Sequence, residues 1–510
     1  MPDRPRNVLF IWTDQQRPDT IGAYRSAGHS GNGSAVSQPA RSVVQTPNVD
    51  RLAADGAMFE QAYCTQPVCS PSRGSVLTGL YPHSHGVPQN NIPLAADIPT
   101  LAELLRPHGY ATGYVGKWHL GNELGRPALN THGFDYWVST EDTYTRDRAV
   151  EGFSDYYHFL IKRGYTPTDE ARDGARVFSR PTEAGLPEDV GKPAFQAAAC
   201  ARFLEARAAE RERPFLLMVN FLEPHPPYFG PNDGLYDPAE MTLPETWYSE
   251  MEPTVPERYR RRREGYAGGE APVATNDERG WKELKARYWG SCTLVDKYVG
   301  QILDRVEALG LAQDTVVVYS TDHGDMMGEH RLLQKSVQYE GATHVPLIIR
   351  APGGAPRRVT TPVSQVHLVP TLLDLLGHET PAHVQGTSLV PLLTTGDTAP
   401  DEADVVIEWN GLPRQISGSG EPADGRGVEA RLRSVNVRTI RRGRWKLNVH
   451  LSREFELYDL QDDPEEHHNA VHDAGVEPVI GDLFERLRAW QARTNDTLVL
   501  PDPRVKDNAR

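Results

Sequence analysis

The sequence of 510 residues is poor in cysteine, has no long hydrophobic run and has no excess of basic residues. Its four cysteines include no CxxC pair, which excludes a disulfide framework and a zinc ribbon. The first apolar run, Val8–Trp12, is shorter than a signal-peptide core or a membrane span. Asp and Glu outnumber Lys and Arg by 69 to 54, and this net charge of −15 argues against binding to nucleic acid or to a membrane surface. We therefore expect a cytoplasmic protein of a reducing compartment that binds neither.

Short apolar runs alternate with helical patterns along most of the chain. The runs are rich in Val, Ile and Phe, as strands buried on both faces are. The helical patterns end with Gly, and the first of them begins with Thr and Pro. This alternation predicts an α/β fold around a mainly parallel sheet. Strands are expected at 7–12, 215–221, 315–320 and 345–350, and helices at 46–56, 98–109 and 298–310.

The pattern changes near residue 400. Four short strand-like pieces are followed there by a helix near 480–492. We expect a large domain over residues 1–395 and a small α+β domain, an antiparallel sheet with a helix, over 396–510. Two stretches rich in Gly and Ser, 28–42 and 410–427, are interpreted as loops. The basic run at 259–265 is interpreted as a solvent-facing or interface segment, and an anion-facing role is its alternative.

Two of the expected strands end in the same way. The run at 7–12 leads into Asp14 and Gln15, and the run at 315–320 leads into Asp322 and His323. Residues just past the carboxyl ends of parallel strands converge on one crevice. Two carboxylates brought together there repel each other unless a cation lies between them. Mostly oxygen ligands suit Ca²⁺, Mg²⁺ or Mn²⁺ better than zinc. The alternative is that each Asp caps the turn after its strand.

A second signal is the segment Cys69-Ser70-Pro71-Ser72-Arg73, which opens an apolar helical pattern. Pro71 suits a first helical turn, so Cys69 is expected at or just before a helix N-terminus. Exposed amides and the nearby Arg73 stabilise an anion at such a place. The position therefore suits a nucleophile or an oxyanion, and the alternative is a buried structural cysteine.

Four more basic side chains are candidates for the same crevice. Lys117 and His119 are two positions apart, so an extended segment points both to one side, where they can stabilise an oxyanion and move a proton. His225 follows the strand at 215–221 in a proline-rich loop that cannot be helical. Lys335 follows Asp322 in the same connection. Singly, each has an ordinary structural explanation. Together with a metal they suit an anionic oxygen ester.

These motifs resemble those of the sulfatase family in the alkaline-phosphatase superfamily. The segment 46–87 is similar to the family signature almost throughout, and it contains Cys-x-Pro-Ser-Arg followed by Leu77-Thr78-Gly79. Further blocks are similar in the same order: GKWHLG, EPHPPY, TDHGDMMGEHRLLQK and RRGRWKLNVH…FELYDLQDDPEEHHN. The resemblance covers residues 7 to about 470. It implies an alkaline-phosphatase-like fold, with a large, mixed, mainly parallel sheet sandwiched by helices and a smaller C-terminal α+β domain.

The resemblance also implies a mechanism. A maturation enzyme oxidises Cys69 to formylglycine, an aldehyde that hydrates to a gem-diol. One hydroxyl, activated by Asp322, attacks the sulfur of a small sulfate ester and displaces the alcohol; His119 then takes the proton of the second hydroxyl as sulfate leaves. Arg73 and Lys117 support the nucleophile, and His225 and Lys335 grip the sulfate and assist the leaving oxygen. One divalent metal, Ca²⁺ first and Mn²⁺ or Mg²⁺ next, is held by Asp14, Gln15, Asp322, His323 and the oxygen of residue 69.

Two departures from the family pattern keep alternatives open. Many sulfatases have Asp where this chain has Gln15 and Asn where it has His323, and the Gln/His pairing resembles the choline-sulfatase and phosphonate-monoester-hydrolase branch. A phosphonate monoester or phosphodiester hydrolase is therefore the first alternative, although Lys117 and His119 favour sulfate.

A catalytically silent, metal-dependent protein that binds anions or glycans is an alternative of another class, against which the intact Cys69 motif argues. A phosphomutase relative would require a second metal cluster, for which His330 and His344 are candidates. The alcohol part of the substrate and assembly into a homo-oligomer stay open.

Overall fold

The computed structural model describes residues 7–25, 43–121, 131–140, 154–170, 176–267, 275–395, 403–411 and 435–505. The loop expected at 28–42 and most of the loop at 410–427 lie outside these residues. The strands are β1 (Asn7–Asp14), β2 (Ala57–Tyr63), β3 (Ala111–Gly116), β4 (Tyr136–Ser139), β5 (Asp169–Glu170), β6 (Arg176–Val177), β7 (Phe215–Pro224), β8 (Thr315–Thr321), β9 (His344–Arg350), β10 (Arg357–Val359), β11 (Val363–Ser364), β12 (Val405–Trp409), β13 (Val437–Arg442), β14 (Trp445–His450) and β15 (Glu456–Asp459).

The helices lie between and after these strands. They are α1 (Gly22–Arg25), α2 (Pro47–Asp55), α3 (Cys69–Thr78), α4 (Pro82–His85), α5 (Leu101–Leu105), α6 (Asp155–Lys162), α7 (Arg180–Ala184), α8 (Lys192–Ala209), α9 (Glu245–Tyr248), α10 (Glu257–Ala267), α11 (Glu278–Ala308), α12 (Glu340–Thr343), α13 (Leu368–Leu376), α14 (Val390–Thr394) and α16 (Glu477–Thr494). The helix expected at 298–310 is the last part of the much longer α11. In the described part of the chain, no helix is both long and apolar enough for a membrane span.

The large sheet is mixed and mainly parallel, as the sequence predicts. Its strand order is β10-β2-β9-β8-β1-β7-β3-β4, with β11 paired to β2. The central strand β1 runs parallel to β7 and β8, and β3 runs parallel to β7. Strand β9 is antiparallel to both β8 and β2. Strands β2 and β3 were not expected from the sequence.

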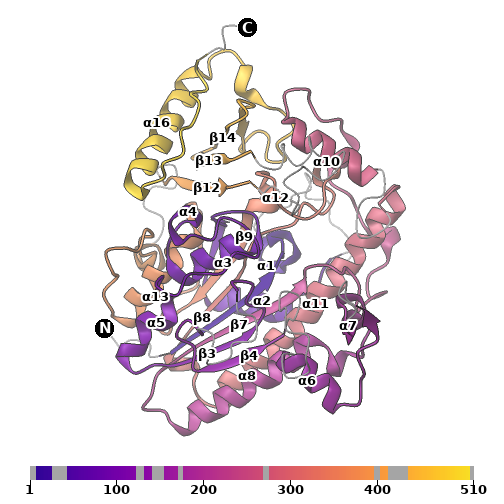
Figure 1. Cartoon of the computed structure of the whole chain (residues 1–510), viewed down its shortest axis with the longest axis vertical. Coiled ribbons are helices and arrows are strands. Elements are labelled where there is room, and N and C mark those ends of the chain that lie inside the picture. The colour runs from indigo at the N-terminus through magenta and orange to yellow at the C-terminus, as the bar shows by residue number, and fades with distance from the viewer. Residues whose placement is uncertain are drawn as a thin grey trace, which may run out of the picture.

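Helices cover both faces of this sheet, so its central strands are buried on both sides (Figure 1). Leu9 and Ile11 of β1 pack in one hydrophobic cluster with residues of α2, α8 and α11. Val8, Phe10 and Trp12 point to the opposite face, where they pack with residues of α3, α5 and α13. Burying one such side chain stabilises the fold by about 1.5–3 kcal/mol, so the carboxyl end of β1 is held by a rigid core.

The C-terminal strands form a second sheet with the antiparallel order β12-β13-β14-β15. Apolar residues of this sheet pack against α16, which lies beside it in Figure 1. Lys446 of β14 joins this sheet to the segment before β9: it donates to the carbonyl of Gln338 and to Glu340 at 2.9 Å each. The predicted α+β character of this region is confirmed. The exact boundary, between residues 395 and 396, falls beside the undescribed residues 396–402, and we retain it as a proposal.

The basic run 259–265 lies in α10 and makes internal contacts. Arg262 donates to the backbone carbonyls of Leu333 and Lys335, and Arg263 donates to the carbonyl of Ser249 at 2.7 Å. The run is therefore an interface segment inside the molecule, and Arg262 holds the loop that carries Lys335.

His83 of α4 links the large domain to the C-terminal region. His83 Nδ1 lies 2.6 Å from Glu408 Oε1, and its Nε2 contacts the carbonyl of Thr494 at 3.0 Å. Burial alone lowers the pKa of His83, but the hydrogen bond and charge of Glu408 outweigh burial and raise it above 6.5. The protonated pair therefore stabilises the fold fully below pH 6.5, and this stabilisation is lost as pH rises through the folded-state pKa.

We expect His83→Gln to lower the free energy of unfolding by about 1 kcal/mol at pH 6 and by less at pH 9, because charged hydrogen bonds exceed neutral ones. Urea unfolding of both proteins at the two pH values measures this difference. An equal loss at both values would show that the charge of His83 contributes nothing.

Candidate metal and catalytic site

Four groups from three separate segments meet at the carboxyl end of the large sheet. Strands β1 and β8 run parallel with Thr13 opposite Thr321, so Asp14 and Asp322 leave the sheet side by side. Helix α3 begins at Cys69, directly after an extended Val68. One ligand atom from each of four buried residues lies within 4.8 Å of all the others: Asp14, Cys69, Asp322 and His323. The predicted convergence of the two strand ends is thus present.

Arg73 links the two carboxylates from behind. Its Nη2 donates to Asp14 Oδ2 at 3.0 Å and its Nε donates to Asp322 Oδ2 at 2.9 Å, with every side chain fully buried. Its Nη1 donates to the carbonyl of Lys117 at 2.9 Å and to Asn220 Oδ1 at 2.7 Å. The guanidinium therefore fixes one oxygen of each carboxylate and leaves the other oxygen, Oδ1, toward Cys69 and His323.

The pKa values of these buried groups are shifted strongly. Burial and the charge of Cys69 raise the pKa of Asp14, but Lys117, with Nζ at 2.7 Å from Oδ2, and other cations bring it below its usual range. Burial and the charge of Asp14 raise the pKa of Asp322 to about 6. For Cys69, burial raises the thiol pKa, but Lys117 and Lys335 bring it well below its usual range. The two carboxylates and an anion at residue 69 thus share one small volume.

The donor set fits a divalent cation. Cys69 Sγ lies 3.3 Å from His323 Nε2 and 3.9 Å from Asp14 Oδ1, and His323 Nε2 lies 3.6 Å from Asp322 Oδ1. His323 Nδ1 contacts the carbonyl of Gly324 at 2.9 Å and therefore carries a proton, which leaves Nε2 as the atom that would bind a cation. Two carboxylate oxygens, one imidazole nitrogen and one anionic group are ligands that Ca²⁺ or Mn²⁺ accepts.

Gln15 and Lys335 lie next to this group. Gln15 Oε1 accepts a hydrogen bond from Lys335 Nζ at 2.6 Å, and its Nε2 donates to Tyr228 and Asp325. Its backbone amide donates to Asp322 Oδ1 at 3.1 Å.

Lys117 and His119 both face Cys69, but the backbone that carries them is not extended as predicted. Lys117 Nζ lies 4.0 Å from Cys69 Sγ, and His119 lies close enough to lower the pKa of Cys69. Strand β3 ends at Gly116, and His119 has a left-handed φ of 59°. A turn of the chain, and not a continued extended segment, directs the two side chains inward.

His225 completes the set from the loop after β7. Its imidazole lies close enough to Cys69 for the two groups to affect each other's charge, and its Nδ1 contacts the carbonyl of Pro226 at 2.9 Å. Burial, Lys335 and Lys117 lower the pKa of His225 to about 3, so the imidazole is neutral at neutral pH. All ten side chains proposed from the sequence therefore lie in one place.

Sequence reasoning missed three residues that hold these groups. Asn220 accepts from Arg73 and donates to Tyr114, and it is the one polar residue in the apolar run at 215–221. Tyr228 and Asp325 hold the amide of Gln15. Both belong to the quoted EPHPPY and TDHGD segments, but nothing in their spacing shows that they meet.

The two histidines considered for a second metal cluster lie elsewhere. His330 Nε2 contacts the carbonyl of Glu465 at 3.0 Å, and His344 Nε2 contacts the carbonyl of Glu60 at 2.8 Å. Among the described residues, the only cluster with metal-ligand geometry is the one that contains Cys69.

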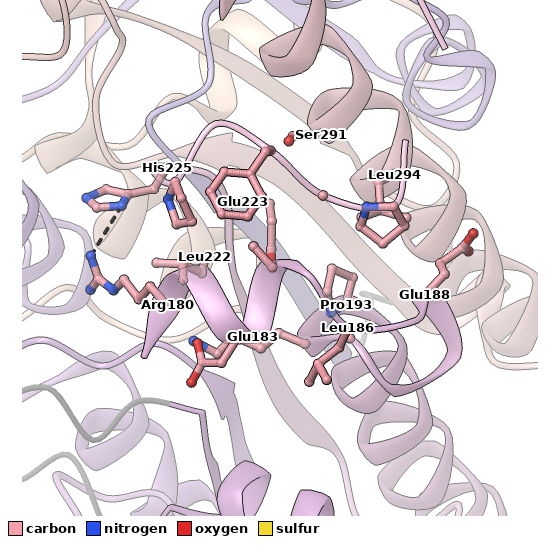
Figure 2. Close-up of a pocket in the computed structure, with 17 residues that line it drawn as sticks. Arg180, Glu183, Leu186, Glu188, Pro193, Leu222, Glu223, His225, Ser291 and Leu294 are labelled. Atoms are coloured by element: carbon pink, nitrogen blue, oxygen red, sulfur yellow. Dashed lines mark hydrogen bonds and ion pairs between the residues drawn. The ribbon is translucent and has the colours of Figure 1, made fainter. Parts of the chain in front are cut away.

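A cleft is lined on one side by His225. Figure 2 shows His225 and Arg180 facing each other at one end, with Arg180 Nη1 3.5 Å from His225 Nδ1. The cleft has mostly apolar walls, to which Leu222 and Leu294 contribute. Glu183 on its wall is paired with Lys192 at 2.6 Å.

Most of this chain is similar to proteins of one family. The Sulfatase family model matches residues 6–378. The uncharacterized sulfatase YidJ of Escherichia coli (strain K12) is 27% identical, over 96% of this chain and 88% of the relative. Choline-sulfatase of Rhizobium meliloti (strain 1021) is 28% identical, over 97% and 88%. The structure of a phosphonate monoester hydrolase from Silicibacter pomeroyi superposes with a TM-score of 0.74 at 25% identity and 96% coverage of each chain. With the family model matched over most of its length, this chain belongs to the sulfatase family.

Proposed function

We propose that this protein hydrolyses sulfate monoesters to an alcohol and inorganic sulfate, with residue 69 as the nucleophile after its oxidation to formylglycine. The observation that carries the proposal is the buried group of Asp14, Cys69, Asp322 and His323, which lies at a helix N-terminus among cationic side chains. Membership of the sulfatase family supports sulfuric ester hydrolysis. In this interpretation Cys69 Sγ stands where the oxygen of the modified residue would lie.

The modification and the metal supply chemistry that the side chains lack. Formylglycine, made by a separate maturation enzyme, supplies a hydrated aldehyde with one hydroxyl to attack sulfur and a second to expel sulfate. A divalent cation supplies Lewis acidity and balances the carboxylates. Asp14, Gln15, Asp322, His323 and residue 69 would hold it. Ca²⁺ is our first candidate because most donors are oxygens, and Mn²⁺ or Mg²⁺ come next.

The surrounding residues orient the nucleophile and move protons. Lys117 contacts both Asp14 and Cys69, so its charge stabilises an anion at residue 69. His119 Nε2 contacts Asn91 Oδ1 at 3.0 Å, so Nε2 carries the proton and Nδ1 keeps a lone pair. His119 is therefore prepared to accept a proton from residue 69.

His225 and Lys335 act on the ester itself. Lys335 points a buried ammonium group toward the site and can pair with a sulfate oxygen. Neutral His225 already uses Nδ1–H on a carbonyl, so donation to the leaving oxygen requires a second proton on Nε2. The negative charge of a bound ester raises the pKa of a neighbouring imidazole and allows it to take up that proton. The cleft that His225 lines is the place for the alcohol part of the substrate.

A phosphonate monoester hydrolase is the second candidate, because a solved enzyme of that activity shares 25% identity and the whole fold. We expect kcat/KM for 4-nitrophenyl sulfate to exceed that for 4-nitrophenyl phenylphosphonate by at least about tenfold, or about 1.4 kcal/mol. Initial rates on both substrates, which share one chromophore, measure the ratio. A ratio below one would assign the protein to phosphonate esters.

A catalytically silent binding protein is the candidate of another class. It would leave both substrates intact, and Cys69→Ala would bind a sulfated ligand as tightly as the unaltered protein does. Turnover of either substrate excludes it.

A further inference from the structure

Asp325 is a fully buried carboxylate just behind the proposed metal site, and its two oxygens do different things. Oδ1 accepts hydrogen bonds from the backbone amides of Met327 and Gln334, both at 2.8 Å. These bonds shape the loop that follows β8. Oδ2 accepts from Gln15 Nε2 at 2.5 Å and from the hydroxyl of Tyr228 at 2.7 Å. The second oxygen therefore acts on a side chain more than 300 positions away in the sequence.

The hydrogen bond between Asp325 and Gln15 determines which end of the Gln15 side-chain amide faces the site. Asp325 Oδ2 can only accept, so it binds the NH₂ end of Gln15 and turns Oε1 in the opposite direction, toward Lys335. Tyr228 supports this orientation: its hydroxyl accepts from Gln15 Nε2 at 3.0 Å and donates to Asp325. Reversing the amide would place oxygen against oxygen, which costs a buried hydrogen bond and adds repulsion.

The backbone conformation of Gln15 is also fixed by its neighbours. Its φ is 72°, in the left-handed region that a residue with a long side chain rarely adopts. The amide donates to Asp322 Oδ1, and the carbonyl accepts from the hydroxyl of Tyr288 at 2.7 Å. Every polar atom of Gln15 thus has a partner. Such strain persists where the surroundings over-determine a conformation, and it is concentrated at functional sites.

We propose that Asp325 is a positioning residue that presents the carbonyl oxygen of Gln15 to the metal. The inference rests on the metal site of the proposed function. A carbonyl oxygen has two lone pairs, so Oε1 can accept from Lys335 and still serve as a metal ligand. Asp325 would then set both the amide ligand and the place of Lys335, without touching either the metal or the substrate.

Exchanging donor and acceptor tests this assignment. Asp325→Asn keeps the shape and keeps an oxygen for the two backbone amides, but it places an NH₂ group against the NH₂ of Gln15. Gln15→Glu adds negative charge next to the site, but it places a carboxylate against Asp325. The double variant restores one donor and one acceptor, with their order reversed.

Binding of Mn²⁺ alone, measured by isothermal titration calorimetry, reports on the ligand without any turnover. We expect each single variant to bind Mn²⁺ about 10- to 100-fold more weakly, the usual effect of losing a residue that orients a ligand. The double variant should bind within about threefold of the unaltered protein, since the reversed pair orients the side chain again. Tyr228→Phe, which keeps the direct Asp325–Gln15 bond, should change affinity by less than about threefold.

Two results would overturn the proposal: Gln15→Glu binding Mn²⁺ more tightly than the unaltered protein, or a double variant no better than the weaker single. If Asp325→Asn alone fails to fold, the comparison of Gln15→Glu with the double variant still decides. Failure of the proposed function gives a different result, which is seen before any variant is made. In that case the unaltered protein binds no divalent cation, or it binds the cation but does not hydrolyse sulfate esters.

Discussion

Replacing Cys69 by Ala is expected to remove sulfate-ester hydrolysis almost completely, with a loss of kcat on the order of 10⁴- to 10⁶-fold, as for other enzymes that lose their nucleophile. The buried Sγ lies among Lys117, His323 and Asp14, and no other nucleophilic side chain occupies that point in the described residues. The fold should persist, because Ala suits the first turn of α3. Initial rates on an aryl sulfate, with circular dichroism of the same samples, measure both effects.

Cys200→Ala is the matched control, because Cys200 is equally buried but lies in α8, within the hydrophobic cluster on the other face of the sheet. It should keep full activity. The mass of the proteolytic peptide that contains residue 69 then shows whether the thiol has become an aldehyde. An active enzyme in which that peptide carries only an unmodified thiol would contradict the formylglycine proposal.

Among the substitutions proposed for this protein, the removal of Arg73 is expected to lower the free energy of unfolding most. Arg73→Met leaves the carboxylates of Asp14 and Asp322 buried without their shared partner, and breaking a buried ion pair from one side costs about 3–5 kcal/mol. A divalent cation can take over part of the charge balance, so added Ca²⁺ or Mn²⁺ should raise the melting temperature of this variant more than that of the unaltered protein. Thermal unfolding with and without the cation measures both effects.

Arg51→Ala provides the comparison. Arg51 pairs with Asp304 at 2.7 Å, but both side chains are exposed, and surface pairs contribute about 0–1 kcal/mol. Arg73→Lys should recover little stability, because one ammonium group cannot reach four acceptors in the plane that a guanidinium spans. If Arg73→Met were as stable as Arg51→Ala, Arg73 would not be the group that holds the two carboxylates.

Much of the site was accessible from sequence because local pattern and topology agree there. Runs buried on both faces predict β1 and β8, and parallel strands have their carboxyl ends at one edge, so the sequence predicts that Asp14 and Asp322 meet there; in the structure the two strands are neighbours. The placement of Cys69 at the start of a helix follows from Pro71 in the first turn. In each case residues near one another in the chain contain the necessary information.

Other features depend on contacts that no local pattern encodes. The direction of β9, the left-handed turn at His119 and the choice of Asn220 as a partner of Arg73 each depend on how distant segments pack. Periodicity is the same for a parallel and an antiparallel strand, so it predicts β9 but not its direction.

The sequence by itself determined which chemical groups gather at the end of the sheet: two carboxylates, an oxidisable cysteine at a helix start and a set of cations. Only the tertiary structure decided which atom of each group faces inward. Arg73 selects the carboxylate oxygens, and Asp325 selects the oxygen end of Gln15 across 310 positions of sequence. The physical reason is that a hydrogen bond is directional and joins particular atoms, and packing determines those atoms only when both partners are in place.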